Sequence, residues 1–241
     1  MDKFAAFSDA GGLVMGYYDA SKTELWGYAQ KYTLADNFFH AAFGGSFLNH
    51  IYLVCVCAPK YPNAPADMVV ARSTPTACWP RTAPVTPDGY AVNTIQTSYQ
   101  PHSAKITDAA KLLPPQEGVT IGDQLSDKGV SWALVLRRLE RRASPASRTR
   151  CSSSITSPSP TSSSSGDGTD ARKEHLKDET DMLAAIADGS LPAVSFWKPI
   201  GAENEHPSYA NVSSGDHKVA TVLKSIEQSP LWAEHRRDHH L

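Results

Sequence analysis

The residues best suited to chemistry in this sequence are a serine and the two glycines before it. Gly44, Gly45 and Ser46 lead into residues that can open a helix. The first amides of a helix direct free N–H groups and a positive dipole end at an anion such as phosphate, and a hydroxyl held among them can attack it. Ser46 is therefore a candidate nucleophile, and Gly44, Gly45, Ser46 and Asn49 are candidate phosphate-binding residues.

The same pattern also has a purely structural interpretation. Gly44-Gly45 would then be a tight turn, and Ser46 would cap the helix, as serine commonly does. His50 lies four residues after Ser46 on the same helical face, where a lone histidine is more often packed or capping than a base. The spacing alone leaves both interpretations open.

Other polar residues give weaker signals. His206 lies in the run Asn-Glu-His-Pro, which on its own indicates an ordinary loop histidine. Asp216 and His217 could suggest a ligand cluster, but Gly215-Asp216 fits a helix cap better. The cysteines lack the paired spacing of a zinc site and leave the redox compartment undecided; they are Cys55, Cys57, Cys78 and Cys151. We therefore predict no metal site from these residues.

Composition narrows the classes of partner. With 23 basic and 25 acidic residues the formal net charge is −2, so no global field favours nucleic acid or anionic lipid. The 241 residues, 41% of them hydrophobic, are enough for one substantial core or two small ones. No run approaches the roughly 18 apolar residues of a membrane helix, and the first residues lack a signal-peptide pattern. We expect no transmembrane segment, no signal peptide in this chain and no nucleic-acid partner, and localisation is left open.

Helical patterns alternate with apolar strand-like runs, which favours an α/β fold with a mainly parallel sheet. Asp19 or Ser21, with Glu24 following, is typical of a helix start and predicts a short helix to Tyr32. Residues 1–60, rich in aromatic side chains, are expected to supply core, and the proline-rich residues 59–118 mostly loop. Further helices are predicted over 120–129, 174–189 and 219–226, and strands over 130–133 and 191–197.

Several blocks of the chain resemble a bacterial phosphoesterase family that contains acid phosphatases and phosphatidylcholine-type phospholipases C; they are residues 9–19, 32–39, 43–50, 86–94 and 205–209. The resemblance covers most of residues 1–133 and 170–233. It implies an alkaline-phosphatase-like α/β/α sandwich that hydrolyses phosphate esters through a Ser or Thr nucleophile, usually beside a divalent metal ion. Ser46 matches the nucleophile, and His206 resembles a histidine that contacts phosphate or protonates the leaving group. The implied partner is a small phosphate ester or a phospholipid head group.

The chain departs from the family pattern at both ends. An N-terminal strand ending in a Glu-Asn metal pair is absent, and so is a C-terminal strand running into Asp-Glu-Asn-Gly-Gly. We therefore expect an incomplete sandwich without its N-terminal and C-terminal strands and with the metal ligands largely missing. The expected function is a phosphoric ester hydrolase, impaired in this chain. The alternative is a vestigial, non-catalytic phosphate-binding fragment.

A segment rich in Ser and Arg follows residue 133 and cannot build a core. Codons can be chosen for residues 134–140 whose shifted frame encodes Trp-Tyr-Ser-Gly-Gly-Trp, a block the family has at this place. Residues 153–162 and 234–240 permit similar shifted readings. We interpret residues 134–169 as a frame-shifted insert, flanked by phosphoesterase parts at 1–133 and 170–233, with an aberrant tail at 234–241. A genuine disordered insertion is the alternative.

Overall fold

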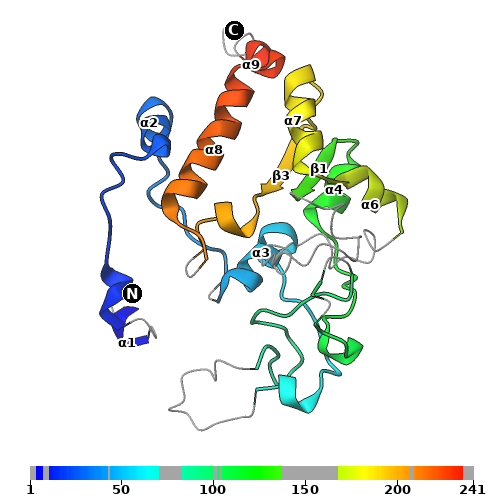
Figure 1. Cartoon of the computed structure of the whole chain (residues 1–241). Coiled ribbons are helices and arrows are strands. Elements are labelled where there is room, and N and C mark those ends of the chain that lie inside the picture. The colour runs from blue at the N-terminus through cyan, green and yellow to red at the C-terminus, as the bar shows by residue number, and fades with distance from the viewer. Residues whose placement is uncertain are drawn as a thin grey trace.

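The structure is a computed structural model and describes residues 4–7, 11–42, 44–70, 83–99, 102–103, 105–136, 168–206 and 209–235. Figure 1 shows these residues as a small sheet with its helices, an irregular region around α3 (Ser46–Cys55), and an extended N-terminal segment. Within the described residues, no helix has the length and apolar character needed to cross a membrane.

The sheet has three parallel strands. β1 (Trp132–Leu136) lies in the middle, between β2 (Leu176–Lys177) and β3 (Val194–Lys198). In the register, Leu134 pairs with Leu176 on one side and with Phe196 on the other. Ala133 to Leu136 are buried, as a central parallel strand requires. The predicted α/β class with a parallel sheet is confirmed, in the form of a small mixed α/β unit.

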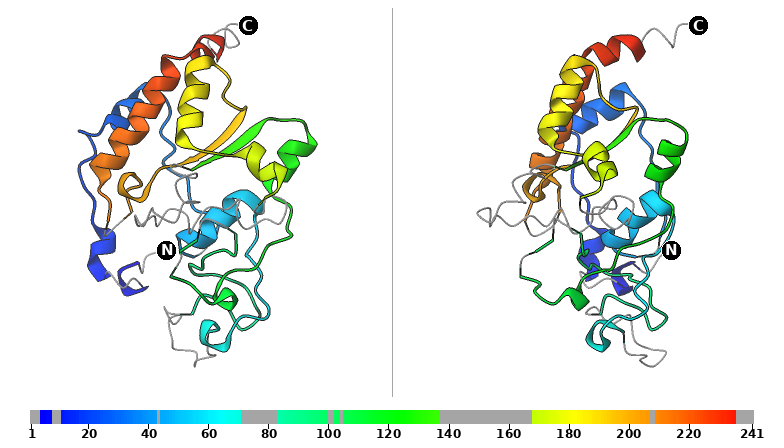
Figure 2. Two further views of the ribbon diagram at one scale, coloured as in Figure 1. Left: turned by 45° about the vertical axis from the view of Figure 1, so that its right-hand side comes forward. Right: turned by 90° about the vertical axis from the view of Figure 1, so that its right-hand side faces the viewer.

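Helices flank this sheet: α4 (Ile121–Asp127), α6 (Asp170–His175), α7 (Glu179–Asp188) and α8 (Val212–Glu227), with α9 (Pro230–His235) at the end of α8. α7 and α8 pack side by side next to the strands (Figures 1 and 2). Their apolar faces meet the sheet in one cluster, made of Ala133, Val135, Met182, Ile186 and Val222.

The ends of two of these helices follow from local chemistry. Thr120 begins α4 with a capping box, in which its backbone N–H donates to Asp123 Oδ2 at 2.7 Å. α7 ends at Gly189, whose φ of 80° is the left-handed conformation that favours glycine. The helix predicted before Gly129 is thus confirmed. The helix predicted over 174–189 is confirmed only from Glu179 onward, because Leu176 and Lys177 pair with β1 as strand β2.

A second apolar cluster lies around α3. Phe47 and Ile51 on this helix pack against residues of the proline-rich region, namely Tyr61, Met68, Val85, Ala91, Ile95 and Leu113. That region contains the short 3-10 turns η2 (Ala66–Met68) and η3 (Ala109–Lys111) and isolated bridges such as Val85 with Ala91. The loop predicted there is confirmed, and the described residues form two small cores.

The N-terminal segment does not supply the core expected of it. It contains α1 (Phe4–Phe7), η1 (Gly11–Met15) and α2 (Glu24–Lys31), and none of residues 11–42 is buried. Tyr17 is 97% exposed and Phe38 85% exposed. The expectation was wrong for these residues because aromatic composition indicates burial only where another element supplies a facing surface.

Asp216 attaches this segment to the rest of the molecule. Its carboxylate accepts hydrogen bonds from the backbone N–H groups of Glu24, at 2.8 Å, and Leu25, at 2.9 Å. These are unpaired amides of the first turn of α2, which a carboxylate satisfies and whose dipole it stabilises. Asp216 is only 6% exposed, so the contact is shielded from water.

Both cap predictions near this contact were wrong. α2 is capped by Thr23 instead of Asp19 or Ser21, because Asp19 accepts a hydrogen bond from the Ser21 N–H in a local turn. α8 begins after Asn211, whose side chain accepts from Ser214 N. Asp216 therefore lies inside α8 and caps a different helix.

The other end of α2 is also held by α8. Glu227 accepts hydrogen bonds from Lys31 Nζ at 2.7 Å and from Tyr32 Oη at 2.6 Å. Near the start of α2, His217 Nδ1 lies 2.7 Å from Glu24 Oε1. The contact between α2 and α8 is therefore polar along its length.

The predicted boundary at residue 134 falls inside β1, which continues to Leu136. Residues 137–167, most of the Ser- and Arg-rich segment, lie outside the described residues, as do residues 236–241 of the predicted tail.

We predict that Asp216→Ala lowers the free energy of unfolding by about 1–3 kcal/mol, because two amides of α2 lose a charged acceptor. Urea denaturation measures this loss, and hydrogen exchange at the Glu24 and Leu25 amides should become faster. Thr221→Ala, an exposed change on the same helix, is the matched control. Equal stabilities and exchange rates for the two variants would contradict the assignment.

Candidate functional site

Ser46 is the first residue of α3, and its side chain is exposed. Gly45 is the N-cap and has no side chain to offer, so the cap interpretation of Ser46 does not hold. The first intrahelical bond runs from Asn49 N to Gly45 O at 3.2 Å. The preceding amides, of Ser46, Phe47 and Leu48, therefore have no acceptor within the helix. The Ser46 hydroxyl stands beside these donors at the positive end of the helix dipole.

Asn49 shapes the turn that precedes Ser46. Its Oδ1 accepts from Ala42 N at 3.0 Å, and its Nδ2 donates to Ala42 O at 3.1 Å. Nδ2 also lies 3.1 Å from Gly44 O and 3.2 Å from Gly45 O. These bonds occupy the Asn49 amide with the backbone of the turn. Asn49 would therefore affect a bound phosphate indirectly, by holding the backbone of Gly44 and Gly45 in place.

Gly44 lies close to the side chain of Leu48. A Cβ at this position would lie 2.9 Å from Leu48 Cδ2, closer than real contacts allow. The glycine lets the turn fold back against the first turn of α3.

His50 is held between the peptide of Ser46 and Lys198. Its Nδ1 lies 2.6 Å from Ser46 O, and its Nε2 lies 3.0 Å from Lys198 Nζ. A carbonyl oxygen only accepts hydrogen bonds, so Nδ1 carries the proton and Nε2 accepts from the lysine. Both ring nitrogens are thus engaged, which fits a packed histidine rather than a general base.

Burial governs the ionisation of this pair. It lowers the pKa of His50, as do the nearby charges of Lys198 and, less strongly, His40, against an opposing hydrogen bond to Ser46 O. Burial also lowers the pKa of Lys198 from 10.5 to about 8.

Lys198 was missed at the sequence level. It is the last residue of β3, and the carboxyl ends of parallel strands are where α/β folds place their sites. A lysine that ends an apolar strand is the signal that could have found it.

His206 lies in the loop after β3, beyond the 3-10 turn η7 (Gly201–Glu203). Its N–H donates to Asn204 Oδ1 at 3.0 Å, and its ring stacks on Tyr209 with centroids 4.6 Å apart. The side chain is exposed.

The loop that carries His206 packs tightly against α8. Glu205 has a φ of 60°, and a Cβ at Gly215 would overlap the Glu205 side chain. Gly215 is therefore needed for this approach, which fixes the residue directly before His206.

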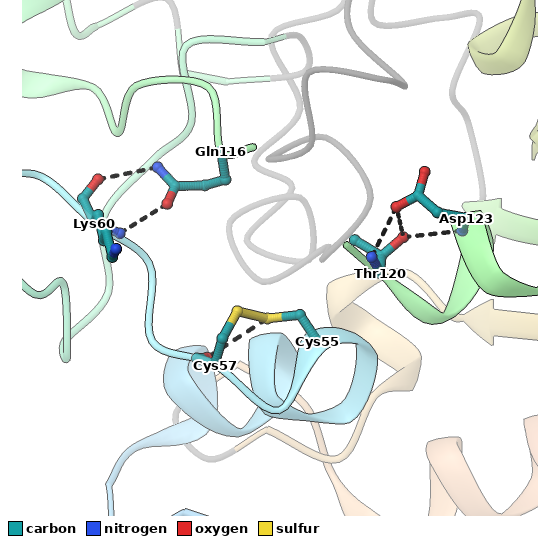
Figure 3. Close-up of a disulfide and its surroundings, with 6 residues drawn as sticks. All are labelled: Cys55, Cys57, Lys60, Gln116, Thr120 and Asp123. Atoms are coloured by element: carbon teal, nitrogen blue, oxygen red, sulfur yellow. Dashed lines mark hydrogen bonds between the residues drawn. A yellow bond between two sulfur atoms is a disulfide. The ribbon is translucent and has the colours of Figure 1, made fainter. Parts of the chain in front are cut away.

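A disulfide joins Cys55 and Cys57 at the end of α3, with 5.1 Å between their Cα atoms (Figure 3). Val56 between them is left-handed, with a φ of 52°. Both cysteines pack against the second core, so the bridge ends the helix on an apolar surface. The sequence interpretation tested the cysteines only as zinc ligands, and it missed this short bridge.

Two further contacts lie around the disulfide in Figure 3. One is the capping box of Thr120 and Asp123. In the other, Gln116 binds the backbone of Lys60 through both atoms of its amide, at 2.7 Å and 3.1 Å. The second contact joins the chain beyond the disulfide to the strand-like residues before α4.

Comparison with known proteins identifies the family of the chain. A model of the phosphoesterase family matches residues 1–235. The chain belongs to the phosphoesterase family. Membership in the phosphoesterase family implies hydrolysis of phosphoric esters and a phosphoester substrate. A search of curated proteins finds no match.

The family resemblance implies a divalent metal ion, which would need ligands among the side chains of the site. In the described part of the chain, no three His, Cys, Asp or Glu side chains lie together in a way that could hold a metal ion. Near Ser46, the Asn49 amide and both nitrogens of His50 are engaged elsewhere. The described residues do not fit a metal, and we assign none of them to it.

We predict that Lys198 makes stability depend on pH above neutrality. Between pH 8 and 10.5 the unfolded chain binds more protons at this lysine than the folded chain, so the free energy of unfolding rises with pH. Lys198→Met should remove that part of the rise. Denaturation at pH 8 and at pH 10 gives the change in the free energy of unfolding for the wild type and for the variant. The contributions of other groups, His40 and His50 included, largely cancel when these two changes are compared.

Lys224→Met, which removes an exposed lysine from α8, is the control and should keep the wild-type slope. An unchanged slope in Lys198→Met would contradict the lowered pKa.

Proposed function

We propose that this chain hydrolyses phosphoric esters with Ser46 as the nucleophile, in the manner of an acid phosphatase or a phospholipase C. The observation that supports it best is the exposed hydroxyl of Ser46 beside three amides without helical acceptors. Such amides can bind the phosphoryl oxygens and stabilise the charge that develops on them during attack. Family membership supplies the reaction class.

The proposed reaction has two displacements. Ser46 Oγ forms a bond to phosphorus as the ester P–O bond breaks, and the serine proton passes to solvent. His206 contacts the phosphate or gives a proton to the departing oxygen. Water then cleaves the phosphoseryl intermediate and restores the serine hydroxyl, which releases inorganic phosphate from a monoester substrate or a phosphomonoester from a diester substrate. Gly44 and Gly45 bring the backbone close to the phosphate, and Asn49 holds their turn.

In this proposal, His206 acts on a substrate that spans its loop and α3. Its exposed ring, stacked on Tyr209, is accessible to a ligand. The proposed substrate is a small phosphate ester or a phospholipid head group.

The proposed fold follows the family. The three parallel strands form part of an alkaline-phosphatase-like α/β/α sandwich, with residues 1–133 and 170–233 as two parts of one domain. The segment 134–169 separates them as an insert, apart from its first three residues, which complete β1.

We predict that Ser46→Ala lowers the release of p-nitrophenol from p-nitrophenyl phosphate and from p-nitrophenylphosphorylcholine by at least about 100-fold, because the nucleophile is removed. The hydrolysis rate of both substrates is measured with and without added divalent metal ions. The wild-type rate also tests the impaired activity expected from the sequence. Ser213→Ala, an exposed serine in the first turn of α8, is the matched control.

Equal turnover by Ser46→Ala and wild type would overturn the proposal. A wild-type chain without turnover, whose Ser46, Phe47 and Leu48 amide resonances shift on adding inorganic phosphate, would instead support the vestigial phosphate-binding fragment.

A further inference from the structure

The imidazole of His50 admits one arrangement of protons in this site. Its Nδ1 must donate, because its partner at 2.6 Å is the carbonyl oxygen of Ser46. Its Nε2 then accepts from the Lys198 ammonium at 3.0 Å. A doubly protonated ring would direct a second N–H at that ammonium and repel it. A charged Lys198 and a neutral His50 therefore require each other.

This contact connects the sheet to the candidate nucleophile. Lys198 ends β3 and is paired with Leu136 in the parallel register, so its backbone is fixed by the strand beside it. His50 lies one helical turn after Ser46 and contacts the carbonyl of that residue itself. The contact therefore runs from the end of a strand to the peptide group of Ser46.

We propose that Lys198 is a positioning residue for Ser46: through His50, it fixes the first turn of α3 and with it the serine hydroxyl. The inference rests on the proposed function for its effect on activity, but the His50 tautomer tests the contact independently. The tautomer of a histidine is set by the hydrogen bond made at its other nitrogen. Without Lys198 only the Ser46 carbonyl holds the ring, and a ring that turns away from that oxygen takes the Nε2–H form that free imidazole side chains prefer.

Burial of both groups supports the inference. Lys198 and His50 are each half-buried, and the lowered pKa of His50 keeps its ring neutral near pH 7. His40 also acts on His50 in the same direction, less strongly than burial and Lys198. The neutral ring is therefore favoured by all three influences: burial, Lys198 and His40.

The tautomer can be measured by long-range ¹⁵N–¹H NMR of the imidazole at pH 7.5. In the wild type we expect His50 to be protonated at Nδ1 and unprotonated at Nε2. Lys198→Met should shift it toward the Nε2–H form, and Lys198→Arg, which keeps a charged donor, should restore the wild-type form. A wild-type tautomer in Lys198→Met would overturn the inference, whatever the activity.

Ester hydrolysis supplies the second readout, with folding checked by thermal unfolding. Lys198→Met should lower kcat about tenfold or more while KM changes little, since a displaced nucleophile slows the chemical step. Lys198→Arg should recover most of that loss, and Lys224→Met should match the wild type. An unchanged kcat in Lys198→Met, or a loss that arginine does not recover, would overturn the positioning role. Full activity in Ser46→Ala would instead overturn the proposed function and leave the tautomer result as the test of the contact.

Discussion

The parallel pairing of β1 with β3 is the constraint on which the described structure depends. Parallel neighbours cannot be joined by a tight turn, so the chain must cross over between them, and the faces of their sheet must be covered. α7 and α8 supply the apolar cluster against Ala133 and Val135. The same pairing fixes where β3 ends, and its last residue, Lys198, contacts α3 through His50. The register of the two strands thus fixes the backbone position of the lysine that contacts the helix of Ser46.

Polar contacts help to link separate parts of the molecule. α3 packs on its own cluster around Phe47 and lies next to α4, and the Lys198–His50 contact joins it to the end of β3. α2 has no buried residue and is held to α8 by Asp216 and Glu227. Buried polar groups are costly without partners, so such contacts specify geometry more strictly than apolar surfaces do. A candidate site assembled in this way is set by a few hydrogen bonds.

Local sequence signals predicted the elements but not how they join. Gly189 correctly marked the end of a helix, and the run from Leu191 correctly indicated a strand, because both effects act within a few residues. Asp216 was assigned to its own helix because its real partners are 191 and 192 residues away. Lys198 was missed for a similar reason, since His50 is 148 residues away. The family blocks gave the family and the reaction class, whereas the roles of Ser46 and His206 remain predictions.

The attachment of α2 through Asp216 places little restriction on the amino acids at the start of α2. The carboxylate recognises peptide N–H groups at positions 24 and 25, and not the side chains there. Every amino acid except proline presents that same donor. Substitutions at these two positions can therefore accumulate without detaching the helix, whereas α8 must retain an acceptor at position 216. Selection on this contact therefore acts on position 216 of α8, whereas positions 24 and 25 of α2 can vary.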